Sequence, residues 1–427
     1  MTASPEYKTR TLWLAGALHA FTHVYQVALM PLYLLIQKDL KLGSVSQATL
    51  LVTVMMVSYC APAYFLGVAA DRFSRKQLLG WGLAINSVGF VLLAFAPNYA
   101  TALGAVFLTG LGGSFYHPAA TAMVARLYPL GTGKALGLVG IGASVGFFCG
   151  PIFAGWRAGM LEPSLGAAAW REPVLELGLL GLAMTGAFVW LSPKESPARL
   201  AQDKTAPPTK LFPTPALWGF FLLAALAFSL RDFTGSGMGS LGSLFLQKAH
   251  GYSPRLTGLA LSGIFLASAI SNPLFGHLSD RGRGRWTLRV LIVAAVVVVL
   301  FPHLPSGATI PAYLVYGFFF MASYPMVEAA LMESVPDAVR GRVFGLFITV
   351  GGLIGNASHW AVGAWVKSLG DRAAMPEAYF SCYGVLGALI IVALVGLPCL
   401  KAIRQREHLE PVSPTDDRAA HNPQLPT

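Results

Sequence analysis

The segment Gly67-Val-Ala-Ala-Asp71-Arg72-Phe-Ser-Arg75-Lys76 lies between two long apolar stretches and returns in shortened form as Gly276-His-Leu-Ser-Asp280-Arg281. The glycines that open the two copies are 209 residues apart, since 276 minus 67 is 209. A second pair, Gln37-Lys38 and Gln247-Lys248, has an offset of 210. Offsets that agree so closely, at matching ends of matching stretches, indicate that the chain contains the same unit twice.

The composition of the chain is that of a membrane protein. Only 11% of the 427 residues are charged, against roughly 25% in an average soluble domain. Hydrophobic residues make up 55% and the mean hydropathy is +0.60, which excludes a disordered chain and an ordinary soluble enzyme. The net charge of +11 is explained by cationic cytoplasmic loops. We therefore expect the lipid bilayer as a partner and no nucleic acid.

Twelve apolar stretches are close to the roughly 20 residues that a helix needs to cross the hydrocarbon core. We therefore expect an all-α membrane protein with twelve transmembrane helices in two pseudo-symmetric six-helix halves. One stretch is longer than a single crossing requires, and its Gly/Ser-rich residues 235–243 predict a bent or broken helix. The twelve stretches are 11–36, 46–70, 77–96, 99–125, 134–159, 174–192, 213–246, 254–278, 286–303, 310–332, 341–367 and 377–399.

The loop charges predict the orientation. With the N-terminus in the cytoplasm, 21 Lys and Arg residues fall in inside loops and tails, 8 fall outside, and Arg231 lies within a span. This asymmetry predicts that both termini are cytoplasmic, in a multi-pass protein of the bacterial inner (plasma) membrane. The expected organisation is a six-helix half at 1–192, a cytoplasmic linker at 193–212, a second half at 213–400 and a disordered tail at 401–427.

The loop that follows the second apolar stretch resembles a signature of the major facilitator superfamily, G-x-x-x-D-R-x-x-R-K. The second copy stands where that superfamily repeats the signature, and the resemblance covers residues 11–400. It implies a secondary transporter that works by alternating access around a site near the midplane. Asp71 can pair with nearby cations, and such ion pairs are expected to lock and release the cytoplasmic ends of the two halves.

The fifth apolar stretch contains Gly137, Gly146, Gly150-Pro151 and Ala154-Gly155. This pattern looks like the superfamily's antiporter motif, with Ala154 where a glycine is usual, and the resemblance implies proton-driven export. Small residues also let helices approach closely, so packing alone explains the same pattern.

The fourth stretch looks similar to the fosmidomycin-resistance branch of drug exporters, on the run from Gly110 to Pro118 that contains His117. That branch tends to have a histidine in its first span, as His19 is here, and an aspartate four residues later. Here His23 occupies that place, a departure from the branch at its proton and substrate site.

Ionisable groups inside a bilayer are costly, so each is a candidate for function. His19, His23 and Gln26 are spaced to share one face of the first helix. Imidazole titrates near neutral pH, which suits a proton carrier. His117 precedes a proline that frees a backbone carbonyl, so it is either structural or functional.

Arg231 and Asp232 are adjacent in the seventh stretch, and helix geometry turns neighbours by ~100°. We therefore expect one of them to face the cavity while the other pairs with a neighbouring helix, or the two to neutralise each other. Glu328 is a lone carboxylate in the tenth stretch. Glu333 matches Arg126 of the other half, and the two form a candidate latch.

These considerations assign a role to each candidate residue. The residues expected to exchange protons are Asp232, Glu328, His23 and His117. The residues expected to contact the substrate are His19, His23, Gln26, His117, Arg231, Asn356 and His359. The residues expected to control the conformation are Asp71, Arg72, Arg75, Asp280, Arg281, Arg126, Glu333, Gly146, Gly150 and Pro151.

The expected function is proton-coupled export of a small organic substrate, anionic or amphiphilic. An alternative with the same fold is a proton-coupled importer of an organic anion, which Arg231 would bind. A remote alternative is a membrane-embedded metal-dependent enzyme using His19, His23 and His117. The chain lacks an H-E-x-x-H motif and a P-loop, so no catalytic residue, bound metal or cofactor is expected.

Overall fold

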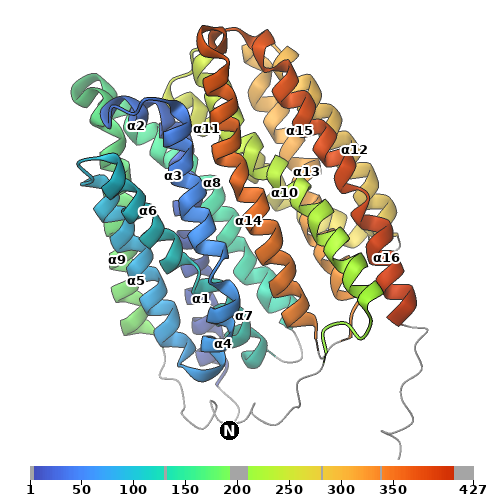
Figure 1. Ribbon diagram of the computed structural model, residues 1–427. Coiled ribbons are helices and arrows are strands. Elements are labelled where there is room, and N and C mark those ends of the chain that lie inside the picture. The colour runs from blue at the N-terminus through green and yellow to red at the C-terminus, as the bar shows by residue number, and fades with distance from the viewer. Residues whose placement is uncertain (1–3, 129–131, 193–209, 280–281, 337–338, 408–427) are drawn as a thin grey trace, which may run out of the picture.

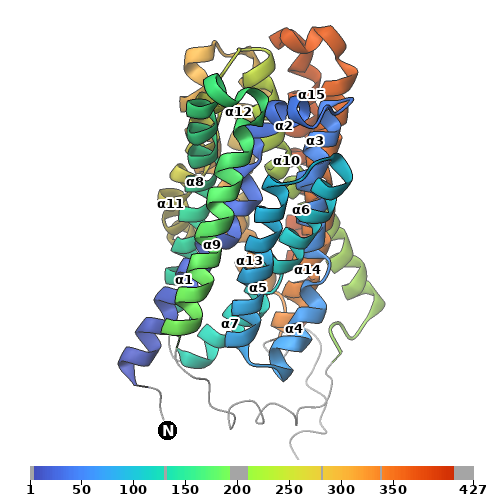
Figure 2. The same ribbon diagram turned by 90° about the vertical axis from the view of Figure 1, so that its left-hand side faces the viewer.

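The chain folds into a long bundle of helices that all run roughly along one direction (Figures 1 and 2). The computed structural model describes residues 4–128, 132–192, 210–279, 282–336 and 339–407. Across these ranges the regular structure is helical, without a strand. Nine helical segments of the described chain are long and apolar enough to cross a membrane, and one of them, Ala135–Leu191, contains two helices.

The two halves of the chain have similar helix orders. The N-terminal half consists of α1 (Pro5–Ala28), η1 (Met30–Leu32), α2 (Tyr33–Asp39), α3 (Val45–Cys60), α4 (Ala63–Arg72), α5 (Arg75–Ala94), α6 (Tyr99–Gly113), α7 (Tyr116–Leu127), α8 (Thr132–Leu165), η2 (Gly166–Trp170) and α9 (Arg171–Leu191). The C-terminal half consists of α10 (Pro215–Lys248), α11 (Pro254–Ser279), α12 (Arg283–Leu300), η4 (Phe301–His303), η5 (Ser306–Ala308), α13 (Thr309–Met332), α14 (Arg340–Ser368), η6 (Gly370–Ala374), η7 (Pro376–Tyr379), α15 (Phe380–Ala393) and α16 (Gly396–Glu407).

Each of the twelve predicted stretches coincides with one helix or with consecutive helices separated by a short break. The breaks lie at or just before prolines, such as Pro31 in η1, Pro62 between α3 and α4, and Pro118 in the first turn of α7. A proline has no N–H for the helical ladder and crowds the preceding turn, so these helices start again instead of continuing. The start of α1 and the end of α16 lie at the same end of the bundle (Figure 1).

The predicted break in the seventh stretch is wrong, because α10 is one uninterrupted helix from Pro215 to Lys248. Its glycines make room for large side chains of other helices. A Cβ at Gly235 would lie 2.7 Å from the Tyr324 hydroxyl, and one at Gly242 would lie 1.5 Å from the Tyr313 hydroxyl. The glycine run therefore provides close packing without interrupting the helix.

The expected boundary of the disordered tail also needs correction. Helix α16 continues past residue 400 to Glu407. Ile403 is fully buried in a cluster with Phe212, Leu217 and Phe221, and Arg404 pairs with Glu333. This burial keeps residues 401–407 helical, and residues 408–427 lie outside the described chain.

Helix α8 packs against α1 through a row of glycines, one on each turn. A Cβ at Gly142 would lie 2.0 Å from the carbonyl oxygen of Gly16, and one at Gly146 would lie 2.2 Å from that of Ala20. Gly150 repeats the approach against Val24, at 2.9 Å. The spacing of four residues places the three glycines on one face, so the two backbones approach more closely than any side chain would permit.

The outer part of α8, defined as the part farthest from the ends of α1 and α16 named above, packs against α11 of the other half. A Cβ at Gly155 would lie 2.3 Å from the Pro254 carbonyl oxygen, and one at Gly258 would lie 2.2 Å from that of Pro151. The small residues of the fifth stretch therefore serve two interfaces in succession, first with α1 and then with α11.

We predict that Gly146→Ala destabilises the protein whereas Gly140→Ala does not. A Cβ at Gly146 collides with the Ala20 carbonyl, while a Cβ at Gly140 meets nothing within 4 Å. Overpacking of this kind costs about 1–3 kcal/mol, and alanine is otherwise the better helix former by up to about 1 kcal/mol. Thermal unfolding of the two purified variants in detergent measures the difference, and equal melting temperatures would contradict the packing described.

Candidate functional site

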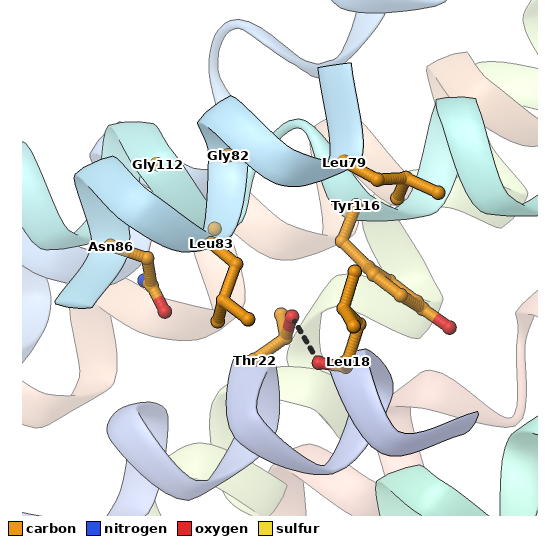
Figure 3. Close-up of a pocket in the computed structure, with 9 residues that line it drawn as sticks. Leu18, Thr22, Leu79, Gly82, Leu83, Asn86, Gly112 and Tyr116 are labelled. Atoms are coloured by element: carbon orange, nitrogen blue, oxygen red, sulfur yellow. Dashed lines mark hydrogen bonds between the residues drawn. The ribbon is translucent and has the colours of Figure 1, made fainter. Parts of the chain in front are cut away.

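The small pocket in the N-terminal half is not large enough for a substrate. It lies between α1, α5, α6 and α7, where Thr22, Asn86 and Tyr116 contribute to its wall (Figure 3). Its volume of about 10 Å³ is close to the space of one water molecule. The ionisable groups inside the spans form two other clusters, one in each half of the chain.

The first cluster consists of His19 and His23 on α1 and His117 on α7, hereafter the histidine cluster. The nearest ring nitrogens of the three side chains all lie within 4.8 Å of one another. His19 and His23 are buried, with 9% and 7% of their surface exposed, whereas His117 is exposed. The sequence predicted that His19 and His23 share a face, and the structure adds His117 to them.

Hydrogen bonds orient the two buried imidazoles of this cluster. His19 Nδ1–H donates to the Val139 carbonyl oxygen of α8 at 2.9 Å, and His23 Nδ1–H donates to Gln26 Oε1 at 2.8 Å. The two Nε2 atoms then face each other at 3.0 Å. Gln26, a predicted substrate contact, is in this conformation a partner of His23.

The second cluster is formed by Arg231 and Asp232 on α10 together with Tyr324 and Glu328 on α13. Arg231 donates from Nη2 and Nε to Asp232 Oδ1, at 2.7 and 3.0 Å, and from Nη1 to the Ser323 carbonyl at 3.3 Å. Its guanidinium carbon lies 4.1 Å from the centre of the Tyr324 ring. Glu328 lies four residues beyond Tyr324 on α13, on the same helix face as the ring that Arg231 contacts.

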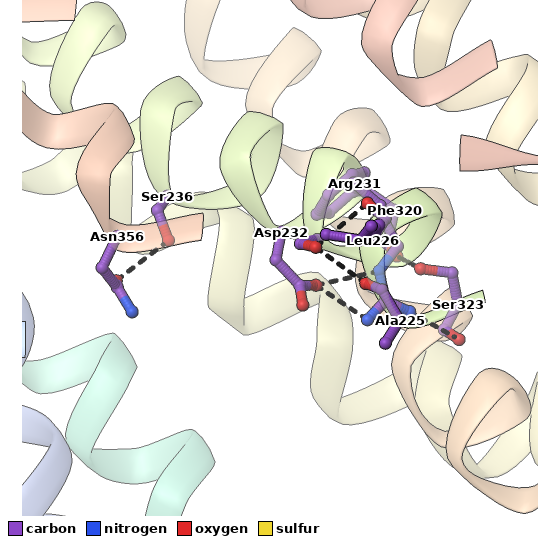
Figure 4. Close-up of polar contacts among 9 residues, drawn as sticks. Ala225, Leu226, Arg231, Asp232, Ser236, Phe320, Ser323 and Asn356 are labelled. Carbon is purple, nitrogen blue, oxygen red and sulfur yellow. Dashed lines mark hydrogen bonds and ion pairs between the residues drawn. The ribbon is translucent and has the colours of Figure 1, made fainter. Parts of the chain in front are cut away.

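Within this pair the carboxylate is the more accessible partner. The Arg231 side chain is 2% exposed and the Asp232 side chain 18%, and Figure 4 shows the Arg231 guanidinium between the Asp232 carboxylate and Ser323. Asp232 lies against α14, because a Cβ at Gly355 would come within 2.8 Å of its Cβ. Of the two expected arrangements, the structure shows the mutual ion pair, in which Arg231 has its three nitrogens engaged with Asp232 and Ser323.

Asn356 and His359 lie on α14, where the two halves meet. Asn356 accepts a hydrogen bond from Ser236 of α10 at 3.2 Å (Figure 4) and contacts Cys60 of α3 at 3.8 Å. His359 is 2% exposed and bonds to Ser240 at 2.7 Å. Both residues were predicted to contact substrate, and in this conformation both connect helices.

Sequence reasoning missed several residues that join the halves. Tyr33 bonds to Ser240 at 2.7 Å, which extends the His359 contact to the N-terminal half. Phe147 of α8 stacks on Phe265 of α11 with ring centres 4.8 Å apart. A hydroxyl or an aromatic ring within an apolar span was the available signal, but such residues are too common in membrane helices to be selected from sequence alone.

The residues expected to control the conformation are described only in part. The side chains of Asp71, Arg72, Asp280, Arg281 and Arg126 lie outside the described set. Arg75 is buried at the start of α5.

Glu333 forms ion pairs with Arg283 and Arg404, both within its own half. The predicted partner across the halves, Arg126, is therefore not needed to satisfy Glu333 in this conformation.

We predict that Arg231→Leu is strongly destabilising and that adding Asp232→Leu recovers a large part of the loss. Removing one partner of a buried pair leaves an uncompensated charge and costs about 3–5 kcal/mol, whereas an apolar replacement of both is often neutral. Denaturant unfolding of the single and double variants measures the two losses. A double variant no more stable than Arg231→Leu would show that the pair does not set the stability of this region.

The family model of the Major Facilitator Superfamily matches residues 12–359 of the chain. The multi-drug resistance efflux pump PmrA of Streptococcus pneumoniae serotype 4 is 28% identical over 377 residues, covering 83% of this chain and 88% of that protein. The multidrug resistance protein MdtH of Yersinia enterocolitica serotype O:8 is 25% identical over 350 residues, covering 77% and 80%.

Solved structures support the same fold. A bacterial homolog of the human lysosomal transporter Spinster, in an inward-facing and occupied conformation, superposes with a TM-score of 0.74 at 18% identity, over 96% of this chain and 100% of that chain. The unoccupied form of that homolog gives a TM-score of 0.71 at 16% identity. The chain therefore belongs to the major facilitator superfamily and is a membrane transporter, not an enzyme.

Proposed function

We propose that the protein exports small amphiphilic organic compounds across the bacterial inner membrane in exchange for protons. The observation that carries this proposal is the imbalance of charge around Arg231. The Arg231 guanidinium is paired with Asp232 and lies over the Tyr324 ring, and Glu328 follows on the same face of α13, four residues beyond Tyr324, so the cluster has a formal charge of −1 when both carboxylates are ionised. A net charge within a bilayer is costly.

A proton on one carboxylate, or a positively charged group of a substrate, neutralises this cluster. Because either one suffices, binding of the substrate favours release of the proton, and protonation favours release of the substrate. That competition is what exchange transport requires. Asp232 is accessible to a substrate, since its side chain is the partly exposed member of the ion pair.

The histidine cluster supplies a second place for a proton. With both Nδ1 atoms donating to oxygen, the two Nε2 atoms at 3.0 Å present lone pairs to each other. A proton between them converts repulsion into a hydrogen bond. His23 and its neighbour His19 are therefore proposed to hold one proton jointly.

The relatives support the direction and the substrate class. PmrA and MdtH are named as multidrug efflux or resistance proteins, and both are similar to this chain over most of its length. Import of an organic anion would rely on Arg231, whose nitrogens are already bonded to Asp232 and Ser323. We therefore favour export.

The orientation that we propose places both termini in the cytoplasm, on the basis of the loop charges. The contacts of α8 with α11 at Gly155 and Gly258 then lie toward the outside. Closure at this end is proposed to belong to the inward-facing state of the transport cycle.

We predict that Glu328→Gln or Asp232→Asn abolishes transport driven by a pH gradient but preserves exchange of substrate at equal pH. The probe is a lipophilic cationic dye such as ethidium, in proteoliposomes containing inside-out protein. An acidic lumen should drive dye uptake by the wild type, and each variant should lower the initial rate at least about tenfold, because its charge no longer changes with a proton.

Glu377→Gln serves as the matched control, because Glu377 is an exposed carboxylate in η7. Gradient-driven transport that survives both cluster substitutions would refute the proton-exchange mechanism. Uptake driven by an acidic exterior instead of an acidic lumen would indicate import.

We also predict that a disulfide between Gly159→Cys and Arg255→Cys stops transport. A Cβ at Gly159 lies 3.1 Å from the Arg255 Cβ, near the 3.5–4.5 Å of ordinary disulfides. The cross-link holds the outer ends of α8 and α11 together, which alternating access must separate. The test uses a background in which Cys60, Cys149, Cys382 and Cys399 are replaced.

Each cysteine alone provides the control, and a reductant should restore dye transport to the level of the uncross-linked protein. A fully cross-linked sample that transports at the normal rate would show that this contact does not open during the cycle.

A further inference from the structure

We propose that the histidine cluster binds one late transition-metal ion, of the class of Zn²⁺ or Co²⁺, through His19, His23 and His117. This proposal reverses the sequence-based expectation that the protein holds no metal, and it does not depend on the proposed export of organic compounds. Three imidazoles form a recurrent protein site for Zn²⁺, with a fourth position left for water or a small ligand.

The first argument is the direction of the ring nitrogens. His19 and His23 each place Nε2 toward the other, 3.0 Å apart. In tetrahedral coordination with Zn–N bonds of 2.0–2.1 Å, two ligand nitrogens are about 3.3 Å apart. The pair therefore needs to separate by only a few tenths of an ångström to share a metal ion.

The second argument is the set of partners behind the two rings. Histidines that bind metals almost always donate the remaining ring N–H to a carbonyl, a carboxylate or a water, which fixes the tautomer. His19 Nδ1 does so to the Val139 carbonyl at 2.9 Å and His23 Nδ1 to Gln26 Oε1 at 2.8 Å. Both Nε2 atoms are thereby left unprotonated, so each has a lone pair available to a metal ion.

The third argument is the position of His117. Its nearest ring nitrogen lies within 4.8 Å of those of His19 and His23, and its ring centre is 5.1 Å from that of His19. The His117 ring lies edge-on to those of His19 and Tyr116, so it is held beside the two buried imidazoles. The exposure of His117 leaves the fourth coordination position accessible to water or to a small anionic or chelating group.

Titration of Co²⁺ into purified, tag-free protein at neutral pH tests the proposal. We expect one ion per chain with the visible ligand-field bands of tetrahedral cobalt, and displacement by Zn²⁺. His117→Ala should weaken binding at least about tenfold and reduce the bands. Gln26→Leu should weaken binding about 10–100-fold, the usual effect of removing a partner of a ligating histidine.

His277→Ala is the control, because His277 is an exposed histidine on α11 and its loss should leave the titration unchanged. Melting of each variant without metal verifies that it is folded, and the exposure of His117 makes its substitution the least disruptive of the ligands. Absence of stoichiometric binding, or binding that is equally strong in His117→Ala, would overturn the proposal. Neither result depends on dye transport, so failure here and failure of the export mechanism are distinguishable.

Discussion

The close approach of α8 to α1 is the contact on which the rest of the structure depends. Gly142, Gly146 and Gly150 bring the two backbones together, in a setting where lipid supplies no hydrophobic drive and van der Waals packing must hold helices in place. The same approach carries the Val139 carbonyl to His19. The glycine row therefore sets the tautomer of a candidate functional histidine as well as the packing of the N-terminal half.

The two halves repeat the helix order but differ in chemistry. The N-terminal half places three imidazole rings on α1 and α7, whereas the C-terminal half places a guanidinium and two carboxylates on α10 and α13. A repeated scaffold with unlike polar groups gives two candidate sites of different chemistry. The repeated loops and the order of the helices nevertheless remain alike in the two halves.

The repeat, the helical class and the positions of the helical stretches could be predicted, because they depend on apolar length and on paired motifs. The prediction of a break in α10 was wrong, because a glycine that interrupts a helix and a glycine that packs against Tyr313 of another helix look the same in sequence. The position of the Asp232 side chain could not be predicted from the sequence either, since it depends on packing against Gly355 of α14. His117 lies far from His23 along the chain, and only the fold brings them together.

The histidine cluster is also in contact with the boundary between the halves. The His23 ring centre lies 4.2 Å from that of Phe147, and Phe147 in turn stacks on Phe265 of α11. Packed side chains do not deform continuously, so movement of one ring requires its neighbours to adopt another arrangement. A proton or a metal ion bound between His19 and His23 would therefore be coupled, through the Phe147 ring, to the packing of α11 in the C-terminal half.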